Sequence, residues 1–436
     1  MYDSRAVVRG RIPVNFKIIS LGCPKNLVES EYIACRLEQA GHVLSDACDT
    51  VIINTCAFIA DAARESIETI LQEAADKDEK GQRIVVTGCL VERYREKLAE
   101  LLPEVDLFAG RGFYPEIERL ISKTGFFLNE TGFKDTYPRK VLTSLPSAYL
   151  KIQEGCDNRC TYCTVPDIRG PLRSRPSEDI VEEFRYLLGQ GFKEINVIGQ
   201  DITSFGRDSG SGLKELLRLL LDVQGDYFLR LLYLHPRGID DELIDIVGHE
   251  NHIVPYLDIP IQHSEDRILH LMGRGYTRDD LESLLKSIKN RVPDITLRTT
   301  LIVGFPGESD EEFSGLCDFI KTWEFDMLGA FTYSREEGTP ASGLRGHVRK
   351  PVKQARYDEI MSIQKDVSKR RLKRLEGRTA QVIIEGQDRP YMVGRLLTQA
   401  PDIDGIAFVK GSCAIGEIRE GKIVKTLDYD VIVEVQ

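Results

Sequence analysis

The apolar residues in the first third of the chain fall into short β-branched runs that alternate with longer stretches of helical spacing. The runs with strand character are Phe16–Ser20, Thr50–Asn54 and Arg83–Thr87. Between them, residues 26–41 and 57–77 place apolar side chains three and four positions apart. Strands that alternate with helices in this way form parallel sheets, because a parallel connection needs a crossover helix. We therefore expect a parallel α/β sheet domain over residues 16–130.

The same alternation returns after a stretch rich in Gly, Pro, Ser and Thr at residues 131–147, which we interpret as a linker. Six strand-like runs follow, at 148–153, 194–199, 227–234, 254–261, 296–305 and 327–334, with helical patterns between them. About six β–α units predict an α/β barrel or an incomplete one.

The last part of the chain changes character. A long polar helix is expected at 351–377, and short β runs separated by Gly turns then extend to the carboxyl terminus. This pattern predicts a small β-barrel. The fold expected is thus a multidomain α/β protein, divided as lead-in 1–15, sheet domain 16–130, linker 131–147, partial barrel with trailing helix 148–373, and β-barrel 374–436.

Composition sets further limits on this chain of 436 residues. It has no apolar run of the roughly 18 residues needed to span a bilayer, and its first 15 residues lack the apolar core of a signal peptide. We expect a cytoplasmic protein without a membrane partner. Ten cysteines in such a protein favour metal binding or catalysis over disulfides. The net charge of −11 argues weakly against nucleic acid as the main partner.

The strongest chemical signal is the cluster Cys156, Cys160 and Cys163, in "EGCDNRCTYCTVP" just after a predicted strand. Three thiolates on one loop suit zinc, copper(I) or an iron–sulfur centre. A structural zinc site takes four ligands, and neither a histidine nor a fourth cysteine lies nearby in the sequence. The set therefore leaves one metal position open.

This C-x3-C-x2-C loop, with the aromatic Tyr162 before its last cysteine, resembles that of the radical S-adenosylmethionine (SAM) enzymes. The resemblance implies a 4Fe-4S cluster whose open iron binds SAM, and reductive cleavage of SAM to a 5′-deoxyadenosyl radical. Tyr162, Gln200, Asp201 and Gly304 are the cofactor-binding candidates it suggests. For Gly304, in "LIVGFPGES", a tight turn before a helix is an equal alternative. His235 and His263 stay unassigned, since a lone histidine is commonly structural.

A second group of cysteines, Cys23, Cys56 and Cys89, is spaced evenly at intervals of 33 residues. Each closes a predicted parallel strand, so all three should emerge at the carboxyl edge of one sheet, where open α/β sheets bind ligands. Cys23 lies between a glycine and a proline in "LGCPKN". Three ligands at equivalent positions imply a second 4Fe-4S cluster. Cys35, Cys48, Cys317 and Cys413 follow no such pattern.

The combination of a three-cysteine α/β domain, a radical SAM barrel and a terminal β-barrel resembles the methylthiotransferase family, whose terminal module is a TRAM domain. The resemblance implies a reaction with two SAM molecules. One methylates sulfur held at the auxiliary cluster, and the other yields the radical that activates a C–H bond for methylthio transfer. It also implies an electron donor such as a flavodoxin or ferredoxin, and a sulfur source.

Two substrates remain open within this family. "LGCPKN", "NTCAFI" and "VGRLLTQAPDIDG" resemble the branch that modifies an aspartate β-carbon of ribosomal protein S-twelve. The terminal barrel agrees, because residues 374–436 hold eight basic and ten acidic side chains, a balance suited to a basic protein partner. Asp402 and Asp404 are expected in an exposed docking loop, with ordinary turn chemistry as the alternative.

Residues 349–378 point the other way, with eleven basic and four acidic side chains. They could contact RNA or form a solvated helix face. A methylthiotransferase acting on a tRNA adenosine is therefore the alternative enzyme. An iron–sulfur ribosome-assembly or redox-sensing factor is the alternative outside catalysis.

Overall fold

The computed structural model describes residues 13–129 and 138–435, and these divide into two compact units. The first comprises Met1–Leu142 with Asp167–Arg169, and the second Thr143–Pro166 with Gly170–Gln436. The predicted lead-in 1–15 lies outside the described residues up to position 12, and the predicted linker does so over 131–137. Each unit is described separately below.

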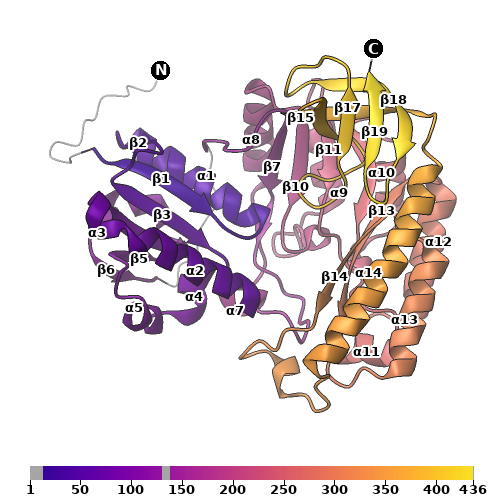
Figure 1. The fold of residues 1–436 in the computed structure, drawn as a ribbon, viewed down its shortest axis with the longest axis horizontal. Helices are drawn as coiled ribbons and strands as arrows, with labels where there is room; N and C mark the ends of the chain where they lie inside the picture. Colours follow the sequence, from indigo (N-terminus) through magenta and orange to yellow (C-terminus); the bar gives the residue numbers. More distant parts are fainter. Residues whose placement is uncertain (1–12, 130–137, 436) are drawn as a thin grey trace. The chain divides into compact units, whose positions relative to one another are not determined.

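The first unit is a six-stranded parallel sheet in the order β2-β1-β3-β4-β5-β6 (Figure 1). Its strands are β1 (Asn15–Ser20), β2 (Val43–Leu44), β3 (Thr50–Thr55), β4 (Arg83–Gly88), β5 (Leu107–Ala109) and β6 (Gly125–Phe127). Its helices are α1 (Pro24–Gln39), α2 (Ala60–Ala75), α3 (Lys77–Lys80), α4 (Cys89–Tyr94), α5 (Lys97–Leu101), the 3-10 helix η1 (Arg111–Glu116) and α6 (Ile117–Leu120). The predicted parallel α/β sheet is confirmed.

Two hydrophobic cores cover the two faces of this sheet. Val51 and Ile53 of β3 face one core, and Ile52, between them, faces the other. This alternation follows from the period of two in a strand, and both faces are apolar because helices cover both. Ile168, near the end of α7 (Val165–Arg169), also packs into the core that contains Val51.

The described end of the predicted linker is attached to this unit. Arg139 and Glu31 form an ion pair in which both side chains are almost fully buried. The backbone N–H of Leu142 also donates to the Glu31 carboxylate. Residues 139–142 therefore belong to the packed structure of the first unit.

The second unit contains a six-stranded parallel sheet in the order β14-β13-β12-β11-β10-β7, with β7 and β14 at its edges. The strands are β7 (Ser147–Lys151), β10 (Glu194–Ile198), β11 (Phe228–Leu231), β12 (Ile253–Asp258), β13 (Thr296–Val303) and β14 (Met327–Thr332). The helices are α8 (Ser177–Gly189), α9 (Leu213–Leu221), α10 (Asp241–His249), α11 (Asp266–Leu271), α12 (Arg278–Arg291), α13 (Asp310–Trp323) and α14 (Lys350–Lys373). This is the expected partial barrel.

Shorter elements join these strands and helices. They are the strands β8 (Gln153–Glu154) and β9 (Arg173–Ser174), and the 3-10 helices η2 (Ile202–Ser204), η3 (Pro236–Gly238) and η4 (Pro340–Gly343). Across the described residues, no helix is long and apolar enough to cross a membrane.

A small closed barrel completes the second unit, as predicted. It is built from β15 (Thr379–Asp388), β16 (Tyr391–Leu396), β17 (Ala407–Lys410), β18 (Ile418–Thr426) and β19 (Val431–Val435), in the order β15-β16-β17-β19-β18. Its core consists of aliphatic side chains, among them Val382, Val409 and Val433.

A buried ionic network fastens the small barrel to the parallel sheet. Glu194, at the start of β10, pairs with Arg230 of β11 and with Arg395 of β16, and the three side chains are at most 3% exposed. Burial alone would raise the pKa of Glu194, but Arg395 and Arg230 outweigh it and hold the pKa at about 2. The charged form of Glu194 therefore stabilises the fold near neutral pH, and this contribution is lost as the pH falls from about 4 toward 2.

Asp404 belongs to the same contact region, so the prediction that it is exposed is wrong. Its side chain is 1% exposed, lies 3.4 Å from the Arg298 guanidinium and accepts a hydrogen bond of 2.8 Å from the Tyr256 hydroxyl. A short polar loop suggested exposure, but the residues that bury Asp404 come from strands more than a hundred positions earlier. Asp402 is exposed and accepts from the Tyr149 hydroxyl at 3.3 Å.

This network predicts that Arg395→Met costs about 3–5 kcal/mol in the free energy of unfolding of the second unit, because it leaves the Glu194 carboxylate buried beside one cation fewer. The matched control is Arg419→Met. Arg419 lies in the same small barrel, but its ion pair with Glu417 is half exposed, and we expect a loss below about 1 kcal/mol. Urea unfolding followed by fluorescence and circular dichroism measures both. Equal losses in the two variants would show that the network does not fasten the small barrel.

Candidate cluster-binding sites

The three evenly spaced cysteines of the first unit follow three adjacent strands of its sheet. Register pairs Ser20 with Asn54 and Asn54 with Thr87, so β1, β3 and β4 end level with one another. Cys23 follows as the N-cap of α1, Cys56 follows β3 directly, and Cys89 is the first residue of α4. The three thiols are thus brought to one edge of the sheet.

Glycine allows two of these cysteines to approach. Gly22 has a φ of +85°, and a Cβ atom there would lie 2.5 Å from the Cβ and 2.7 Å from the Sγ of Cys56. Gly88 has a φ of +94°, and a Cβ atom there would lie 2.4 Å from the side-chain oxygen of Asn54 and 2.5 Å from the carbonyl oxygen of Thr55. Any side chain at either position would push the strand ends apart.

The charge surroundings of the three thiols differ. Burial alone would raise the pKa of Cys23, but Lys25, Arg169 and the backbone N–H groups of Asn26 and Lys25 outweigh it and lower that pKa. Burial raises the pKa of Cys56 to about 12, with a smaller contribution from Cys89. Burial also raises the pKa of Cys89, although Arg169 and Arg111 oppose it. Cys23 is therefore the thiol most easily ionised before a ligand binds.

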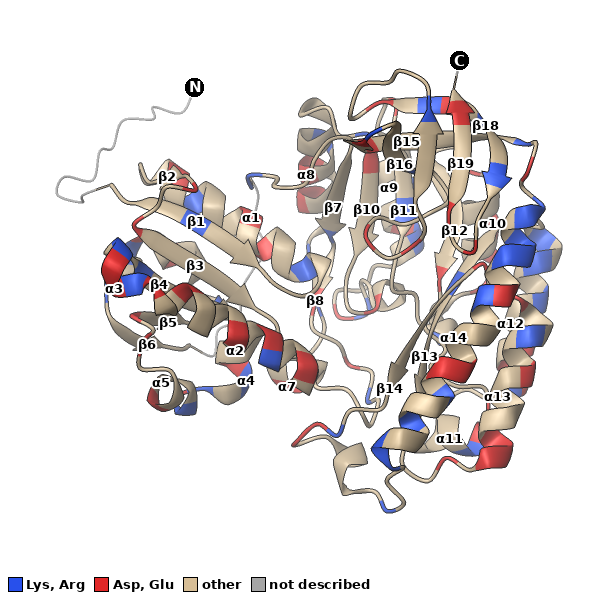
Figure 2. Cartoon of the chain, in the orientation of Figure 1, with Lys and Arg blue, Asp and Glu red and all other residues tan. Residues whose placement is uncertain are grey.

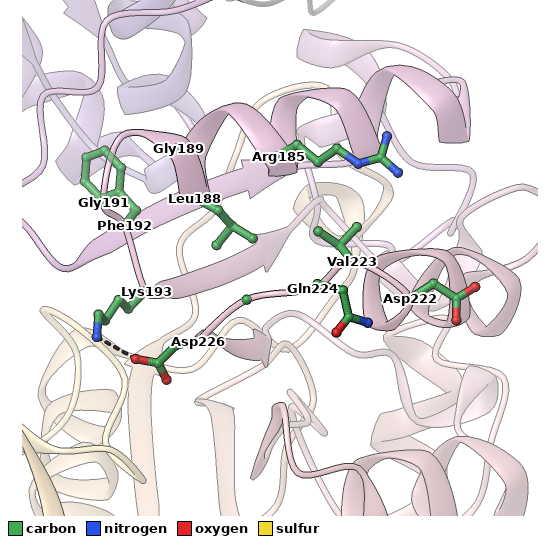
Figure 3. A pocket seen from close by; sticks show the side chains of 11 residues that line it. Arg185, Leu188, Gly189, Gly191, Phe192, Lys193, Asp222, Val223, Gln224 and Asp226 are labelled. Carbon is green, nitrogen blue, oxygen red and sulfur yellow. Dashed lines mark hydrogen bonds and ion pairs between the residues drawn. The ribbon is translucent and has the colours of Figure 1, made fainter.

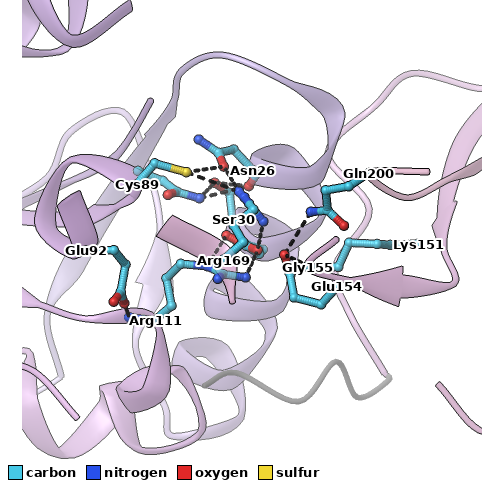
Figure 4. A network of polar contacts seen from close by, with 12 residues as sticks. Asn26, Ser30, Cys89, Glu92, Arg111, Lys151, Glu154, Gly155, Arg169 and Gln200 are labelled. Atoms are coloured by element: carbon cyan, nitrogen blue, oxygen red, sulfur yellow. Dashed lines mark hydrogen bonds and ion pairs between the residues drawn. The ribbon is translucent and has the colours of Figure 1, made fainter. Parts of the chain in front are cut away.

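A buried polar network that the sequence did not reveal surrounds Cys89 (Figure 4). The Arg169 guanidinium donates to the Cys89 sulfur at 3.3 Å and to the Asn26 side-chain carbonyl. It also pairs at 2.9 Å with Glu29, which pairs in turn with Arg111 at 2.6 Å. Asn26 lies within "LGCPKN", but Arg111 and Arg169 lie outside every motif that contains these cysteines, so the sequence did not link them to the site.

The second group, Cys156, Cys160 and Cys163, lies on the loop that follows β7 and β8. Gly155 begins the loop with a φ of +74°, and a Cβ atom there would lie 2.1 Å from the Pro171 carbonyl oxygen. Thr161 anchors the middle, because its backbone N–H donates to the Met272 carbonyl and its own carbonyl accepts from the Ala341 N–H. The loop is therefore held by backbone hydrogen bonds to two other segments of the second unit, at Met272 and at Ala341.

One buried arginine also contacts this group. Arg274 donates to the Cys160 sulfur at 3.3 Å and to the Tyr276 hydroxyl at 2.8 Å. Burial raises the pKa of Cys156 to about 11 and that of Cys163 to about 12. These two thiols must lose protons to become ligands, so binding of a metal centre here is coupled to proton release.

The four residues suggested as cofactor contacts occupy different surroundings. Tyr162 packs against an apolar cluster that includes Met272, Phe305 and Ala341. Gln200 donates from its amide nitrogen to Glu154 at 2.8 Å, and its amide oxygen is buried without a hydrogen-bond partner. That oxygen is a polar group for which a bound ligand would provide a partner.

Asp201 and Gly304 have local structural roles. The Asp201 carboxylate accepts from Asn158 of the cysteine loop at 2.6 Å and from the hydroxyls of Thr203 and Ser204. Asp201 thus positions the loop. Gly304 has a φ of +70°, and a Cβ atom there would lie 2.4 Å from the Lys353 side chain. This close packing accounts for glycine at that position.

Two histidines left unassigned are buried and neutral. Burial lowers the pKa of His235 and of His263 to about 3. Each accepts a backbone hydrogen bond on Nδ1, His235 from Arg237 and His263 from Glu265. Both geometries are those of structural residues.

A hollow of about 600 Å³ lies in the second unit, and its lining includes none of Cys156, Cys160 and Cys163 (Figure 3). It is lined by residues that precede β10 and β11, among them Leu188, Phe192, Lys193, Val223 and Asp226. These residues mark the amino-terminal end of the parallel strands, whereas the cysteine loop follows the carboxyl end of β7. Ligands of parallel α/β structures bind at the carboxyl end, so this hollow is no candidate for the active site.

Each donor set has the chemistry of an iron–sulfur site. Within the described part of the chain, no three His, Cys, Asp or Glu side chains converge closely enough to ligate one metal ion. A four-iron cluster is a larger ligand that takes one thiolate on each iron, and each group offers three thiols with a guanidinium on one sulfur. Hydrogen-bond donors on sulfur are a common feature of such sites.

Three family models match parts of this chain. Residues 150–320 match the radical SAM superfamily, residues 377–435 match the TRAM domain, and residues 15–110 match a family described as "Uncharacterized protein family UPF0004". The fold and the cysteine loop thus define a radical SAM protein.

Proteins named ribosomal protein uS12 methylthiotransferase RimO are similar along nearly the whole length. Those of Acetivibrio thermocellus and Geobacter sulfurreducens are 42% and 43% identical, over 96% of this chain and 97% and 98% of theirs. That of Thermotoga maritima is 41% identical over 94% of this chain and 97% of its own. The chain belongs to this RimO family of methylthiotransferases, and the family resemblance drawn from the motifs is confirmed.

Among solved structures, the radical SAM methyltransferase TsrM from Kitasatospora setae aligns with a TM-score of 0.57 and 16% identity, covering 76% of this chain and 77% of that one. At this identity the likeness concerns the fold alone.

The thiol surroundings predict that Cys23 is alkylated first among Cys23, Cys56 and Cys89 when the metal-free protein meets iodoacetamide at pH 8 under anaerobic conditions. Cys23 has the lowered pKa and is partly exposed, whereas Cys56 and Cys89 are about 5% exposed. Mass spectrometry of tryptic peptides gives the three rates. The urea-denatured protein is the control, in which the rates should converge. Faster reaction of Cys56 or Cys89 in the folded protein would contradict the assigned electrostatics.

Proposed function

We propose that this chain transfers a methylthio group to the β-carbon of an aspartate of uS12, the small-subunit protein S-twelve, using two 4Fe-4S clusters and SAM. One observation carries the proposal: the chain has two separate groups of three cysteines, one in each compact unit, within a protein of the RimO family. Loaded with its clusters, such a protein has one centre that cleaves SAM reductively and another that holds sulfur for transfer.

The residues of the chain divide between these two tasks. Cys156, Cys160 and Cys163 would hold the radical cluster, on a loop kept in place by Asp201 through Asn158. Cys23, Cys56 and Cys89 would hold the auxiliary cluster at the carboxyl edge of the first sheet. Each set of three leaves one iron of a four-iron cluster without a protein thiolate, as binding of SAM or of sulfur requires.

The residues proposed to contact SAM are chosen for where they lie in the second unit. Gln200, with its buried amide oxygen, and Tyr162, inside the cysteine loop, are the candidates for contact with SAM. Asp201 acts through the loop, and Gly304 allows close packing. A low-potential donor such as a flavodoxin or ferredoxin would supply electrons, and a separate sulfur source would supply the auxiliary cluster.

Charge supports a protein partner for the small barrel. Its sequence carries more acidic than basic residues. Asp402 is exposed and could face such a partner, whereas the Asp404 side chain is buried. The basic residues along the carboxyl-terminal half of α14, visible in Figure 2, are matched by acidic neighbours. Arg370 and Arg374 pair with Glu324, Arg371 pairs with Asp326, and Lys365 pairs with Asp428. These pairs give four of the eleven basic residues of 349–378 partners within the second unit, which favours a protein substrate over tRNA.

The substrate proposal predicts a mass difference in uS12. In cells that lack this gene, intact uS12 should be lighter by the mass of one methylthio group less one hydrogen. Expression of the wild-type chain should restore the heavier form. Cys156→Ala is the matched inactive variant and should not restore it. An unchanged uS12 mass in the deletion strain would overturn the substrate. In that event, a change in the methylthio content of tRNA would favour the alternative enzyme.

A further inference from the structure

Arg169 is a buried cation that contacts Cys89, a candidate cluster ligand of the first unit. Its side chain is 5% exposed and donates to three acceptors: the Cys89 sulfur, the Asn26 carbonyl and the Glu29 carboxylate. The neighbouring Ile168 packs into the hydrophobic core of this unit, which holds the end of α7 in place. The Arg169 backbone is therefore held by the packing of Ile168, and its guanidinium is held by the three hydrogen-bond acceptors.

The partners of Arg169 are themselves constrained. Glu29 is 0% exposed and lies between Arg169 and Arg111. Asn26 donates from its amide nitrogen to the carbonyls of Leu21 and Thr55, both at 2.9 Å, so its oxygen is oriented toward Arg169. The orientation of the guanidinium toward Cys89 is thus set before any cluster binds.

A cationic donor on a ligand sulfur has a definite electrostatic consequence. Each electron added to an iron–sulfur cluster makes it more negative, so a nearby positive charge stabilises the reduced form more than the oxidised form. The effect is large where water is excluded, because the charges are poorly screened. Hydrogen bonds to the cluster sulfurs act in the same direction.

We propose that Arg169 is a positioning residue that raises the reduction potential of the auxiliary cluster through its charged hydrogen bond to Cys89. The inference rests on the proposed function only in that it takes Cys23, Cys56 and Cys89 as ligands of a 4Fe-4S cluster. It assigns Arg169 no contact with substrate or SAM. Reduction of the cluster takes up one electron, and no bond to Arg169 forms or breaks.

The test is a redox titration of the full-length chain in which Cys156, Cys160 and Cys163 are replaced with Ala, so that only the auxiliary cluster is assembled. Dithionite is the reductant, and electron paramagnetic resonance follows the reduced cluster. In this background Arg169→Met should lower the one-electron reduction constant at least tenfold, which is a shift of about 59 mV to more negative potential. Arg169→Lys keeps the charge and should shift the potential by less than half as much.

Arg36→Gln is the matched control, because Arg36 lies on α1 of the same unit but pairs near the surface with Glu118. We expect it to leave the potential unchanged. Arg169→Met with about four irons per chain and an unshifted potential would overturn the proposal, as would an equal shift in Arg169→Lys. If Arg169→Met fails to hold a cluster, Arg169→Gln takes its place. The Gln side chain keeps a donor without the charge and should give a smaller shift in the same negative direction, and an unshifted potential there would also overturn the proposal.

This readout is independent of the substrate. A potential that shifts as expected together with an unchanged uS12 mass would refute the proposed substrate while supporting the role of Arg169. A chain that binds no iron at Cys23, Cys56 and Cys89 would refute the cluster itself.

Discussion

The level ending of three parallel strands is the constraint on which the first site depends. Because β1, β3 and β4 pair in register, Ser20, Asn54 and Thr87 form one row across the sheet. Residues two or three positions further along each strand must then meet at the same edge. The even spacing of Cys23, Cys56 and Cys89 means that the chain returns to this edge twice, each time after 33 residues. Gly22 and Gly88 permit this meeting, since neither position has room for a side chain.

The parts of the account that could be predicted from sequence are those with a local signature. Strands β1, β3 and β4 follow from β-branched runs, and the cysteine loop follows from C-x3-C-x2-C, because each pattern lies within a few residues. The short strands β2, β5 and β6 have no such run and were not predicted. Arg169 could not be found in this way. Its acceptor Cys89 is 80 positions away, and nothing in "TVPDIRG" distinguishes a buried contact with a cysteine sulfur from a surface helix end.

For Asp404, local composition led to a wrong prediction rather than to none. The loop "APDIDG" has the composition of an exposed turn, and Asp402 is indeed exposed. Asp404 is buried because Tyr256 and Arg298 of the parallel sheet supply a hydrogen bond and a countercharge. The cost of burying a carboxylate is met only by partners that fold beside it, and these are invisible to local composition. The basic run on α14 is a similar case, since its ion pairs involve residues from other elements.

The central claim is that the two cysteine groups hold two clusters with different tasks. The most direct measurement is anaerobic reconstitution of two triple variants, in which either Cys156, Cys160 and Cys163 or Cys23, Cys56 and Cys89 are replaced with Ala, followed by iron analysis and assay of 5′-deoxyadenosine. We expect about eight irons for the wild type and about four for each variant. Of the two variants, only the one that keeps Cys156, Cys160 and Cys163 should cleave SAM. Equal loss of cleavage in both variants, with about four irons retained in each, would contradict this division of tasks.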